Sequence, residues 1–279
     1  MAKKVSLINM KGGVGKSTLT VNLAWCFALR HDKKVLVVDL DPQFNASQYL
    51  LGETGYARFL DTGRPTIWDL FERNTRSPFA PTTPVLVRDA IHNRESFPGG
   101  GRIDLIPSRL DLAFSLKSPY QQKEAELGRS LAEVEAAYDL VLIDCAPTES
   151  LLTTAAYLAS DWLLVPVRPE HLSSVGLPLL TTSLNDFRGV YPSRSPAIAG
   201  IVFNATTDYA PEERLAKDVV RQLAAQKQWH LFENTIPYSR SFPASSRIGL
   251  SVFNTPYTRR RTRRRFEIFV EEFARRIQL

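Results

Sequence analysis

A short run of glycines and lysines near the start of the chain is the feature best suited to chemistry. Residues Lys11-Gly12-Gly13-Val14-Gly15-Lys16-Ser17-Thr18 follow an apolar run, Val5–Asn9, and precede a helical pattern, Lys16–Arg30. In the order strand, glycine-rich turn, helix, backbone N–H groups converge on an anion at a helix N-terminus. Lys16 would contact β- and γ-phosphates, and the Ser17 hydroxyl would bind Mg²⁺. We therefore predict a phosphate-binding loop rather than an ordinary glycine-rich turn.

The second lysine of this loop, Lys11, is unusual. A phosphate loop needs only Lys16 to contact its own nucleotide. A lysine at the start of the loop instead indicates contact with a phosphate held by a facing subunit. The alternative is a solvated lysine beside the phosphate site.

Carboxylates follow two apolar runs of the chain. Asp39 and Asp41 flank Leu40 at the end of the run Val35–Asp39, and side chains two residues apart on a strand share a face. Asp144 ends the run Leu140–Asp144, where a carboxylate would be costly without a cation. We predict that Asp144 holds Mg²⁺ directly or through water. A capping aspartate at position 144, and a turn formed by Asp41 and Pro42, are the plainer alternatives.

The pattern of apolar runs predicts the elements that position these residues. The runs are mostly continuous rather than alternating, which is typical of strands buried on both faces of a parallel sheet. Helical patterns lie between them, so we expect a doubly wound α/β fold with a mostly parallel sheet and helices on both faces. The expected strands are Val5–Asn9, Val35–Asp39, Ile103–Pro107, Leu140–Asp144, Trp162–Val167, Ile198–Phe203 and Asn234–Ile236. The expected helices are Lys16–Arg30, Lys123–Ala137, Ser150–Ala159, Leu177–Phe187 and Glu212–Lys227.

The 279 residues are expected to form a single domain. Residues 52–101 are rich in Pro, Gly, Thr and Arg, and we interpret them as an irregular excursion with one short helix near Ile67–Arg73. Residues 258–279 combine arginines with apolar residues at helical spacing, which predicts a basic C-terminal helix. Its apolar residues, expected to pack on the core, are Phe266, Phe269, Val270, Phe273 and Ile277.

Taken in order, the motifs resemble those of the ParA/MinD family of P-loop ATPases, which carry a deviant Walker A loop. The similarity is closest to the short, Soj-like ParA partition ATPases. It rests on Lys11–Thr18, Asp39–Gln43, Leu105–Ser108 and Leu140–Pro147, which span most of the chain. The resemblance implies an ATPase that uses ATP and Mg²⁺ and forms a homodimer when ATP binds. It also implies that Lys11 reaches the phosphates of the partner subunit, that Asp41 orients the attacking water, and that Asp39 lies in the outer shell of Mg²⁺.

Two further residues are assigned by the same resemblance. Asn204 follows the run Ile198–Phe203 and is similar to the asparagine that contacts adenine in this family, and Pro237 falls near the expected base pocket. An amide can pair with both a donor and an acceptor on a base edge. The expected nucleotide-binding residues are thus Lys11, Gly12, Gly13, Val14, Gly15, Lys16, Ser17, Thr18, Asn204 and Pro237, and the expected catalytic residues are Lys11, Lys16 and Asp41.

Positive charge is concentrated near the C-terminus. The net charge is +6, and six arginines fall within seven residues: Arg259, Arg260, Arg261, Arg263, Arg264 and Arg265. Such a concentration favours a polyanionic partner, and we predict DNA bound without sequence specificity, with an anionic lipid surface or a solvated face as alternatives. Arg240 is a further candidate for DNA contact, although its register differs from that of the family motif.

The residues and the resemblance together predict a DNA partition or positioning ATPase of the cytoplasm and nucleoid. A ParB-like partner would stimulate hydrolysis and release the DNA. A MinD-like enzyme at a membrane, or a ParA-like ATPase that positions a protein cargo, is the alternative. No apolar run approaches the ~20 residues of a membrane span, so we do not expect a membrane partner. A cluster-carrying relative of the nitrogenase iron protein would need bridging cysteines, which Cys26 and Cys145 do not suit. A small-molecule kinase is disfavoured by Lys11.

Overall fold

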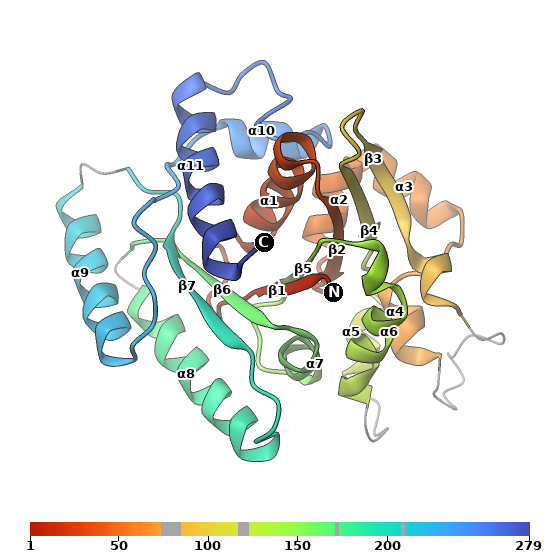
Figure 1. Ribbon diagram of the computed structural model, residues 1–279, viewed down its shortest axis with the longest axis horizontal. Helices are drawn as coiled ribbons and strands as arrows, with labels where there is room; N and C mark the ends of the chain where they lie inside the picture. Colours follow the sequence, from red (N-terminus) through yellow and green to blue (C-terminus); the bar gives the residue numbers. More distant parts are fainter. Residues whose placement is uncertain (74–84, 117–122, 171–172, 208–209) are drawn as a thin grey trace.

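The computed structural model describes residues 1–73, 85–116, 123–170, 173–207 and 210–279 (Figure 1). Within these residues a seven-stranded sheet has the order β3-β4-β2-β5-β1-β6-β7. Neighbouring strands are parallel except for β3 and β4, which are antiparallel. The predicted doubly wound, mostly parallel α/β fold is confirmed. The strands are β1 (Lys3–Leu7), β2 (Lys34–Leu40), β3 (His92–Ser96), β4 (Arg102–Ile106), β5 (Leu140–Cys145), β6 (Trp162–Val167) and β7 (Ala197–Phe203).

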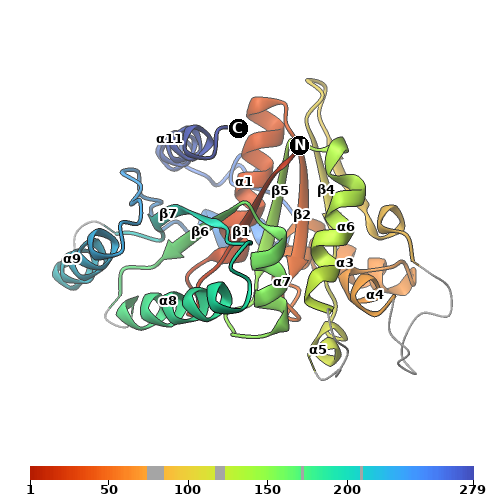
Figure 2. The ribbon, with the colours of Figure 1, turned by 60° about the horizontal axis from the view of Figure 1, so that its bottom comes forward.

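Helices cover both faces of this sheet. Figure 2 shows α1 and α11 on one side of the strands and α7 and α8 on the other. The α-helices are α1 (Lys16–His31), α2 (Asn45–Leu51), α3 (Glu53–Asp61), α4 (Ile67–Glu72), α5 (Leu112–Ser115), α6 (Glu126–Val134), α7 (Leu151–Ala159), α8 (Ser173–Val190), α9 (Pro211–Gln226), α10 (Ser241–Arg247) and α11 (Arg260–Ile277). Short 3₁₀ turns are η1 (Val87–Ala90), η2 (Lys123–Ala125) and η3 (Glu135–Ala137), so the helix expected over Lys123–Ala137 is divided into η2, α6 and η3.

Successive residues of the central strands belong to two different hydrophobic cores. Val35 and Val37 of β2 pack with the core beneath α1, α2 and α11, whereas Leu36 and Val38 pack with the core beneath α4, α6, α7 and α8. All four residues are fully buried. A strand buried on both faces has no polar alternation, because side chains alternate between two apolar layers. This explains the continuous apolar runs of the sequence.

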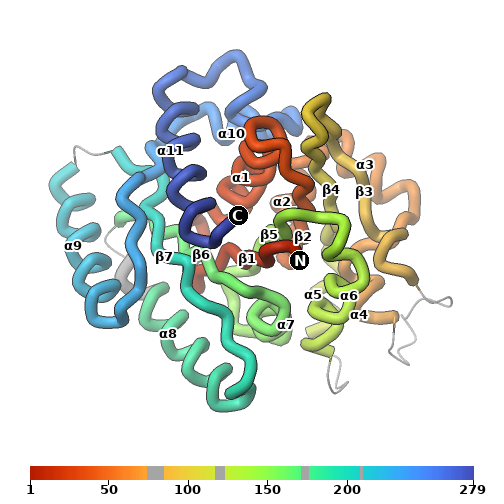
Figure 3. The backbone as a smooth tube through the Cα atoms, viewed as in Figure 1, coloured from red at the N-terminus to blue at the C-terminus, as the bar shows by residue number. Residues whose placement is uncertain are grey.

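The excursion over residues 52–101 is more regular than the sequence indicated. It contains α3, α4, η1 and the strand β3, and Figure 3 shows these elements gathered at one edge of the molecule beside β4. The predicted short helix is present as α4. Strand β3 was not expected, because its residues are polar and none of them is buried. It pairs with β4 at the outer edge of the sheet, where a strand needs few apolar residues.

One predicted strand is absent as such. Residues Asn234–Ile236 are not a strand, although the Ile236 N–H donates to the Phe203 carbonyl at 2.9 Å. Two isolated bridges flank this segment, between Ile201 and Leu231 and between Thr206 and Pro237. The apolar pattern of Asn234–Ile236 therefore indicates a segment that packs beside β7 and not a strand of the sheet.

Helix α11 closes one face of the sheet. Its residues Phe266, Phe269, Val270, Phe273 and Ile277 are all fully buried. Burying a large apolar side chain contributes about 1.5–3 kcal/mol, so this stripe anchors the C-terminal helix firmly to the core. Among the described residues, no helix has the length and apolar character needed to cross a membrane.

Candidate functional site

The glycine-rich loop joins β1 to α1 at the carboxyl edge of the sheet. Gly13 and Gly15 have φ of 73° and 89°, a backbone region that favours glycine. A Cβ on Gly15 would also lie 2.2 Å from Asn204 Nδ2. The Asn204 amide donates to the Val14 carbonyl at 2.8 Å, which fastens the loop to the end of β7. No side chain caps the N-terminus of α1, so its first N–H groups remain available to an anion.

Lys16 lies inside this loop with its ammonium group held by the backbone. Its Nζ donates to the Asn9 carbonyl at 3.1 Å and to the Lys11 carbonyl at 3.2 Å. Burial lowers the pKa of Lys16 from its ordinary value, and the negative charges of Asp144 and Asp41 partly offset that effect. The lysine thus places a poorly solvated positive charge in the concave side of the loop, where it would attract phosphate.

Asn9 is a positioning residue that sequence reasoning missed. Its Nδ2 donates to the Pro166 carbonyl of β6 at 2.9 Å, and its Oδ1 accepts from the Lys11 N–H at 2.9 Å. The side chain is only 2% exposed. Asn9 therefore fixes the start of the loop to the neighbouring strand. The available signal was a polar residue directly after an apolar strand and two residues before Lys11.

The two strand-end carboxylates Asp39 and Asp144 lie side by side, because they are register partners on β2 and β5. Both are completely buried. Burial raises the pKa of Asp144 well above its usual range, and the neighbouring charge of Asp39 adds to this effect, whereas the Ser17 hydroxyl and the positive charge of Lys16 oppose it. Thr20 donates to Asp144 Oδ1 at 3.3 Å, while Oδ2 is buried without a hydrogen-bond partner among the described residues. A buried carboxylate oxygen without a donor, next to Lys16 and the Ser17 hydroxyl, fits a cation that is also bound to phosphate.

Asp39 differs from Asp144 because its carboxylate is already occupied. Its Oδ2 accepts from both the N–H and the hydroxyl of Ser47, each at 2.7 Å. The Ser47 hydroxyl in turn accepts from the Ser108 N–H at 2.9 Å. Burial raises the pKa of Asp39 to about 7, and these hydrogen bonds oppose the rise. Asp39 therefore also positions helix α2, a role that the sequence did not reveal because Ser47 carries no motif.

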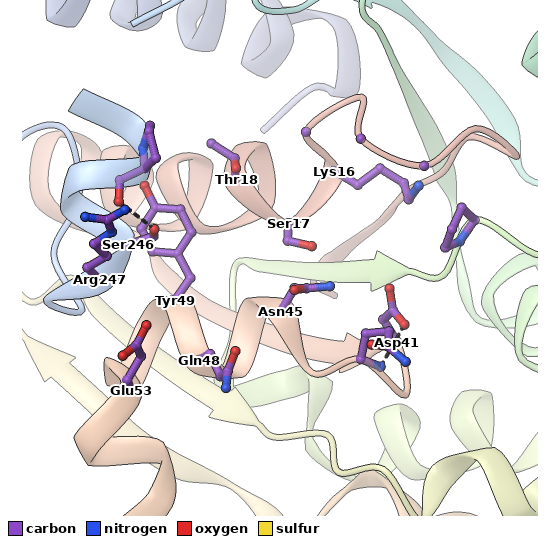
Figure 4. A pocket seen from close by; sticks show the side chains of 16 residues that line it. Lys16, Ser17, Thr18, Asp41, Asn45, Gln48, Tyr49, Glu53, Ser246 and Arg247 are labelled. Atoms are coloured by element: carbon purple, nitrogen blue, oxygen red, sulfur yellow. Dashed lines mark hydrogen bonds between the residues drawn. The ribbon is translucent and has the colours of Figure 1, made fainter. Parts of the chain in front are cut away.

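Asp41 begins the loop between β2 and α2. Its Oδ1 accepts from the Gln43 N–H at 2.9 Å, and the residue is 6% exposed. In Figure 4 the side chains of Asp41, Ser17 and Lys16 face a common space. This carboxylate is close enough to influence the pKa of Lys16. The placement suits a group that orients a water molecule against a phosphate bound by the loop.

Two adjoining cavities surround the loop. The larger, of about 470 Å³, is lined by Gly12, Gly13, Gly15, Lys16, Ser17, Thr18 and Asp41 at one end and by residues of α2 and α10 at the other (Figure 4). The smaller, of about 140 Å³, is lined by Val14, Asn204 and Pro237 together with Tyr238 and Phe242. Gly13, Gly15 and Thr18 border both. The arrangement matches a phosphate compartment joined to an apolar base compartment.

Comparison with known proteins identifies the family that uses this arrangement. A family profile described as an AAA domain matches residues 2–193. The chromosome-partitioning ATPase Soj of Treponema pallidum is 32% identical over 252 residues, which cover 90% of this chain and 89% of that protein. The chain belongs to the ParA/MinD family of P-loop ATPases. It is accordingly a ParA-like ATPase of the partition and positioning class.

Solved structures of similar fold agree with this assignment. Apo McdA of Cyanothece has a TM-score of 0.79 at 20% identity, with 98% of this chain and 99% of that chain covered. A putative plasmid partition protein of Borrelia burgdorferi, bound to AMPPNP, has a TM-score of 0.73 at 22% identity, with 98% and 100% covered. At these identities the likeness establishes the shared fold.

Within this ParA/MinD-type ATPase, Lys11 does not line either cavity. Its Nζ lies 3.4 Å from Glu170 Oε2, and 23% of the side chain is exposed. Gly176 of α8 packs against it so closely that a Cβ on Gly176 would lie 3.1 Å from Lys11 Cβ. The structure thus separates Lys11 from the other predicted nucleotide-binding residues, which it brings together around the two cavities.

The structure of this ATPase divides the six clustered arginines into three groups. Arg263 donates to the Val252 and Thr255 carbonyls at 3.1 and 2.7 Å, and Arg265 donates to Thr235 at 2.7 Å. Arg264 lies 3.8 Å from Glu267 and 3.6 Å from Glu271. Arg259, Arg260 and Arg261 are exposed at the start of α11, and Arg240 is exposed at the start of α10. The Ser241 hydroxyl donates to the Tyr257 carbonyl at 3.3 Å, which joins these two helix starts.

Proposed function

We propose that this chain is an ATP- and Mg²⁺-dependent partition ATPase that forms a homodimer on ATP and binds DNA without sequence specificity. The position of Lys11 carries the proposal. This lysine belongs to the glycine-rich loop, yet its ammonium group lies against Glu170 and outside both cavities. Its function is to contact the phosphates of a partner subunit, as an arginine finger does when it is supplied in trans.

In this proposal each residue of the site has a distinct task. Lys16 and the loop N–H groups bind the phosphates, and Asn204 and Pro237 bind the base. Asp144 and Ser17 hold Mg²⁺, with Asp39 in its outer shell, and the cation neutralises charge that develops on the phosphates. Asp41 orients the water that attacks the γ-phosphate. ATP favours the dimer because its γ-phosphate is contacted by both subunits.

The proposed DNA surface is narrower than the arginine cluster of the sequence. Arg259, Arg260 and Arg261 lie at the N-terminus of α11, where the first turn contains no acidic residue. Three cations at the positive end of a helix dipole are unfavourable unless an external anion compensates them. Together with Arg240 they would contact phosphates of the DNA backbone, whereas the anchored Arg263 and Arg265 hold the helix in place. Binding to DNA would keep the protein on the nucleoid in the cytoplasm. A ParB-like partner would stimulate hydrolysis and so release the protein from the DNA.

The MinD-like alternative, binding to a membrane, is supported less well. The apolar residues of α11 are buried in the core, so they are not available to insert into lipid. The other alternative, transport of a protein cargo by the same ATP cycle, uses the same nucleotide site and DNA surface. Co-sedimentation with DNA and with anionic liposomes, in the presence of ATP, separates the membrane alternative from the DNA-binding proposal.

Lys11→Ala tests the proposed dimer. We expect the variant to bind ATP as a monomer and to lose ATP-dependent dimerisation, measured by sedimentation velocity with Mg²⁺ and ATP. Lys227→Ala, which removes an exposed lysine next to α9, is the matched control and should dimerise like the parent. A Lys11→Ala variant that still dimerises on ATP would leave a P-loop ATPase without the proposed contact in trans.

A further inference from the structure

A third cavity lies on the other side of the molecule from the basic helix starts, in the angle between α7 and α8. Its volume is about 320 Å³. Figure 2 shows α7 and α8 next to each other on the side of the sheet opposite α1. The Tyr157 hydroxyl of α7 lies 2.8 Å from the Ser183 hydroxyl of α8, and the Tyr157 ring stacks edge-on against Phe187 at 5.1 Å. These contacts hold the two helices at a fixed angle and leave a groove beside them. We refer to it as the α7–α8 groove.

The α7–α8 groove combines an apolar floor with an acidic rim. Leu151, Phe187 and Val190 form its apolar lining, and Val190 is 70% exposed. The carboxylates come from Glu124 of η2, Glu149 of the loop before α7 and Asp186 of α8. Phe187 is buried and Leu151 is half-buried, so Val190 is the exposed part of this lining. Three carboxylates around one apolar floor are unusual in a chain whose net charge is +6.

These carboxylates form no ion pair with any described residue. Glu124 accepts a hydrogen bond from the Tyr191 hydroxyl at 3.0 Å, and Glu149 and Asp186 are exposed. Two basic residues that neighbour these carboxylates in the sequence have other partners. Lys123 is buried against Glu72, and Arg188 donates to the Ser195 hydroxyl at 3.0 Å. The negative potential of the groove is therefore available to a cationic ligand.

The groove also adjoins the nucleotide site through a short loop. Asp144 is the next-to-last residue of β5, and Pro147, two residues after the end of that strand, lines the phosphate cavity. Glu149 and Leu151, which line the groove, come two and four residues after Pro147. The Thr153 hydroxyl donates to the Thr148 carbonyl and so ties this loop to the start of α7. A ligand in the groove would thus contact the same loop that borders the phosphates.

We infer that the α7–α8 groove is the docking site for a cationic, amphipathic segment of the partner that regulates this ATPase. Lysine or arginine side chains of the segment pair with Glu124, Glu149 and Asp186, while an apolar side chain packs on Phe187 and Val190. Charge complementarity and the apolar floor with the exposed Val190 select this occupant over an anionic or purely polar one. The regulatory role of the partner rests on the proposed function, whereas the docking surface itself does not.

A fluorescent model peptide tests the inference directly. Its sequence would place lysines and arginines on one helical face and leucines and phenylalanines on the other, and binding would be followed by anisotropy at several salt concentrations. We expect the double variant Glu149→Gln/Asp186→Asn to bind at least ~10-fold more weakly than the parent. Val190→Ser should weaken binding independently of charge. The control Glu212→Gln/Asp218→Asn makes the same change of charge on the exposed face of α9 and should bind like the parent.

Two results would overturn the inference: equal binding to the parent and to Glu149→Gln/Asp186→Asn, or equal binding of an analogue in which glutamine replaces every lysine and arginine. The rate of ATP hydrolysis without peptide is measured alongside for each variant. Neither Glu149 nor Asp186 lines the nucleotide cavities, so the double variant should hydrolyse ATP at the parent rate. If the parent protein does not dimerise on ATP or does not bind DNA, the proposed function is wrong. The peptide comparison would still show whether the α7–α8 groove binds a cationic segment.

Discussion

Asp39 and Asp144 face each other across neighbouring strands as register partners of β2 and β5, and both are completely buried. Two carboxylates so placed repel each other and lose their hydration. Asp39 is compensated by three hydrogen bonds, from the N–H and hydroxyl of Ser47 and from the Asp41 N–H. Asp144 retains an oxygen without a partner among the described residues. This difference between the two carboxylates is the reason that we propose Asp144 as the residue that binds the cation.

Asp144→Asn is expected to stabilise the nucleotide-free protein. Because the pKa of Asp144 is raised in the folded chain, its ionised form destabilises the fold. This penalty is absent below about pH 4, where the carboxyl is protonated in both states, and it grows as pH rises towards the raised pKa. At pH 8 we expect a gain of about 1–3 kcal/mol in the free energy of unfolding. The variant should also lose the effect of Mg²⁺ on ATP affinity.

Urea unfolding at pH 8 measures this effect, with Asp104→Asn as the control. Asp104 is also buried, but it accepts from Tyr138 at 2.7 Å and from Asn93 at 2.8 Å and pairs with Arg102 at 2.7 Å. Its replacement should lower stability, because a satisfied carboxylate is removed. If Asp144→Asn is destabilised as strongly as Asp104→Asn, the assignment of Asp144 as an uncompensated carboxylate is wrong.

Asp41→Ala should separate ATP binding from hydrolysis. Removing a group that orients water raises the chemical barrier but leaves Lys16 and the loop N–H groups in place, so we expect ATP affinity near that of the parent and a rate at least ~100-fold lower. Asp61→Ala, at the exposed end of α3, serves as the control. Phosphate release at saturating ATP gives the rate. Hydrolysis at the parent rate by Asp41→Ala would remove Asp41 from the reaction.

Asn204→Ala should weaken contact with the base of the nucleotide and also remove one contact that holds the glycine-rich loop. The Asn204 amide donates to the Val14 carbonyl and lines the smaller cavity. Loss of this contact is expected to raise the Kd for ATP by about 10-fold and to reduce the preference for ATP over GTP, because phosphate contacts alone do not distinguish the bases. Competition with a fluorescent nucleotide analogue measures both quantities. An unchanged ratio of ATP to GTP affinity would exclude Asn204 from base recognition.

Gly15→Ala gives an independent check of the same contact. A Cβ at this position would meet Asn204 Nδ2 at 2.2 Å and would require a left-handed backbone. We expect Gly15→Ala to lose ATP binding and to unfold at a lower temperature than the parent. The double variant Gly15→Ala/Asn204→Ala should regain part of that stability, because it removes the steric clash but keeps the cost of the left-handed backbone. Thermal unfolding of the two variants shows whether that coupling exists.

The sequence predicted the features that depend on local pattern. The loop Lys11–Thr18 and the strand-end aspartates could be placed because continuous apolar runs preceded them. Strand β3 could not, because pairing at a sheet edge requires no buried side chains at His92–Ser96. The roles of Asn9 and Ser47 depend on partners far along the chain, Pro166 and Ser108, which no local pattern reports.

The arginine cluster shows the same limit. Sequence spacing treats its six members alike, but the path of residues 252–255 decides that Arg263 faces backbone carbonyls while Arg259–Arg261 face solvent. Which arginines of the cluster are exposed is therefore decided by tertiary contacts and not by their spacing in the sequence. Four of the six remain exposed, and one of these, Arg264, is paired with Glu267 and Glu271. The strength expected for the proposed DNA surface is therefore set by Arg259, Arg260 and Arg261.

DNA binding in the presence of ATP and of ADP tests the central claim most directly. We expect the parent to bind a short duplex of mixed sequence with ATP, with a log–log salt slope of roughly −5 for about six neutralised phosphates per dimer, and with about half that slope and far weaker affinity with ADP. Arg259→Ala/Arg260→Ala/Arg261→Ala should lose this binding, whereas the control Arg58→Ala/Arg88→Ala/Arg194→Ala, which removes three exposed arginines elsewhere, should retain it. Equal affinity of the parent in ATP and ADP would contradict the proposed switch.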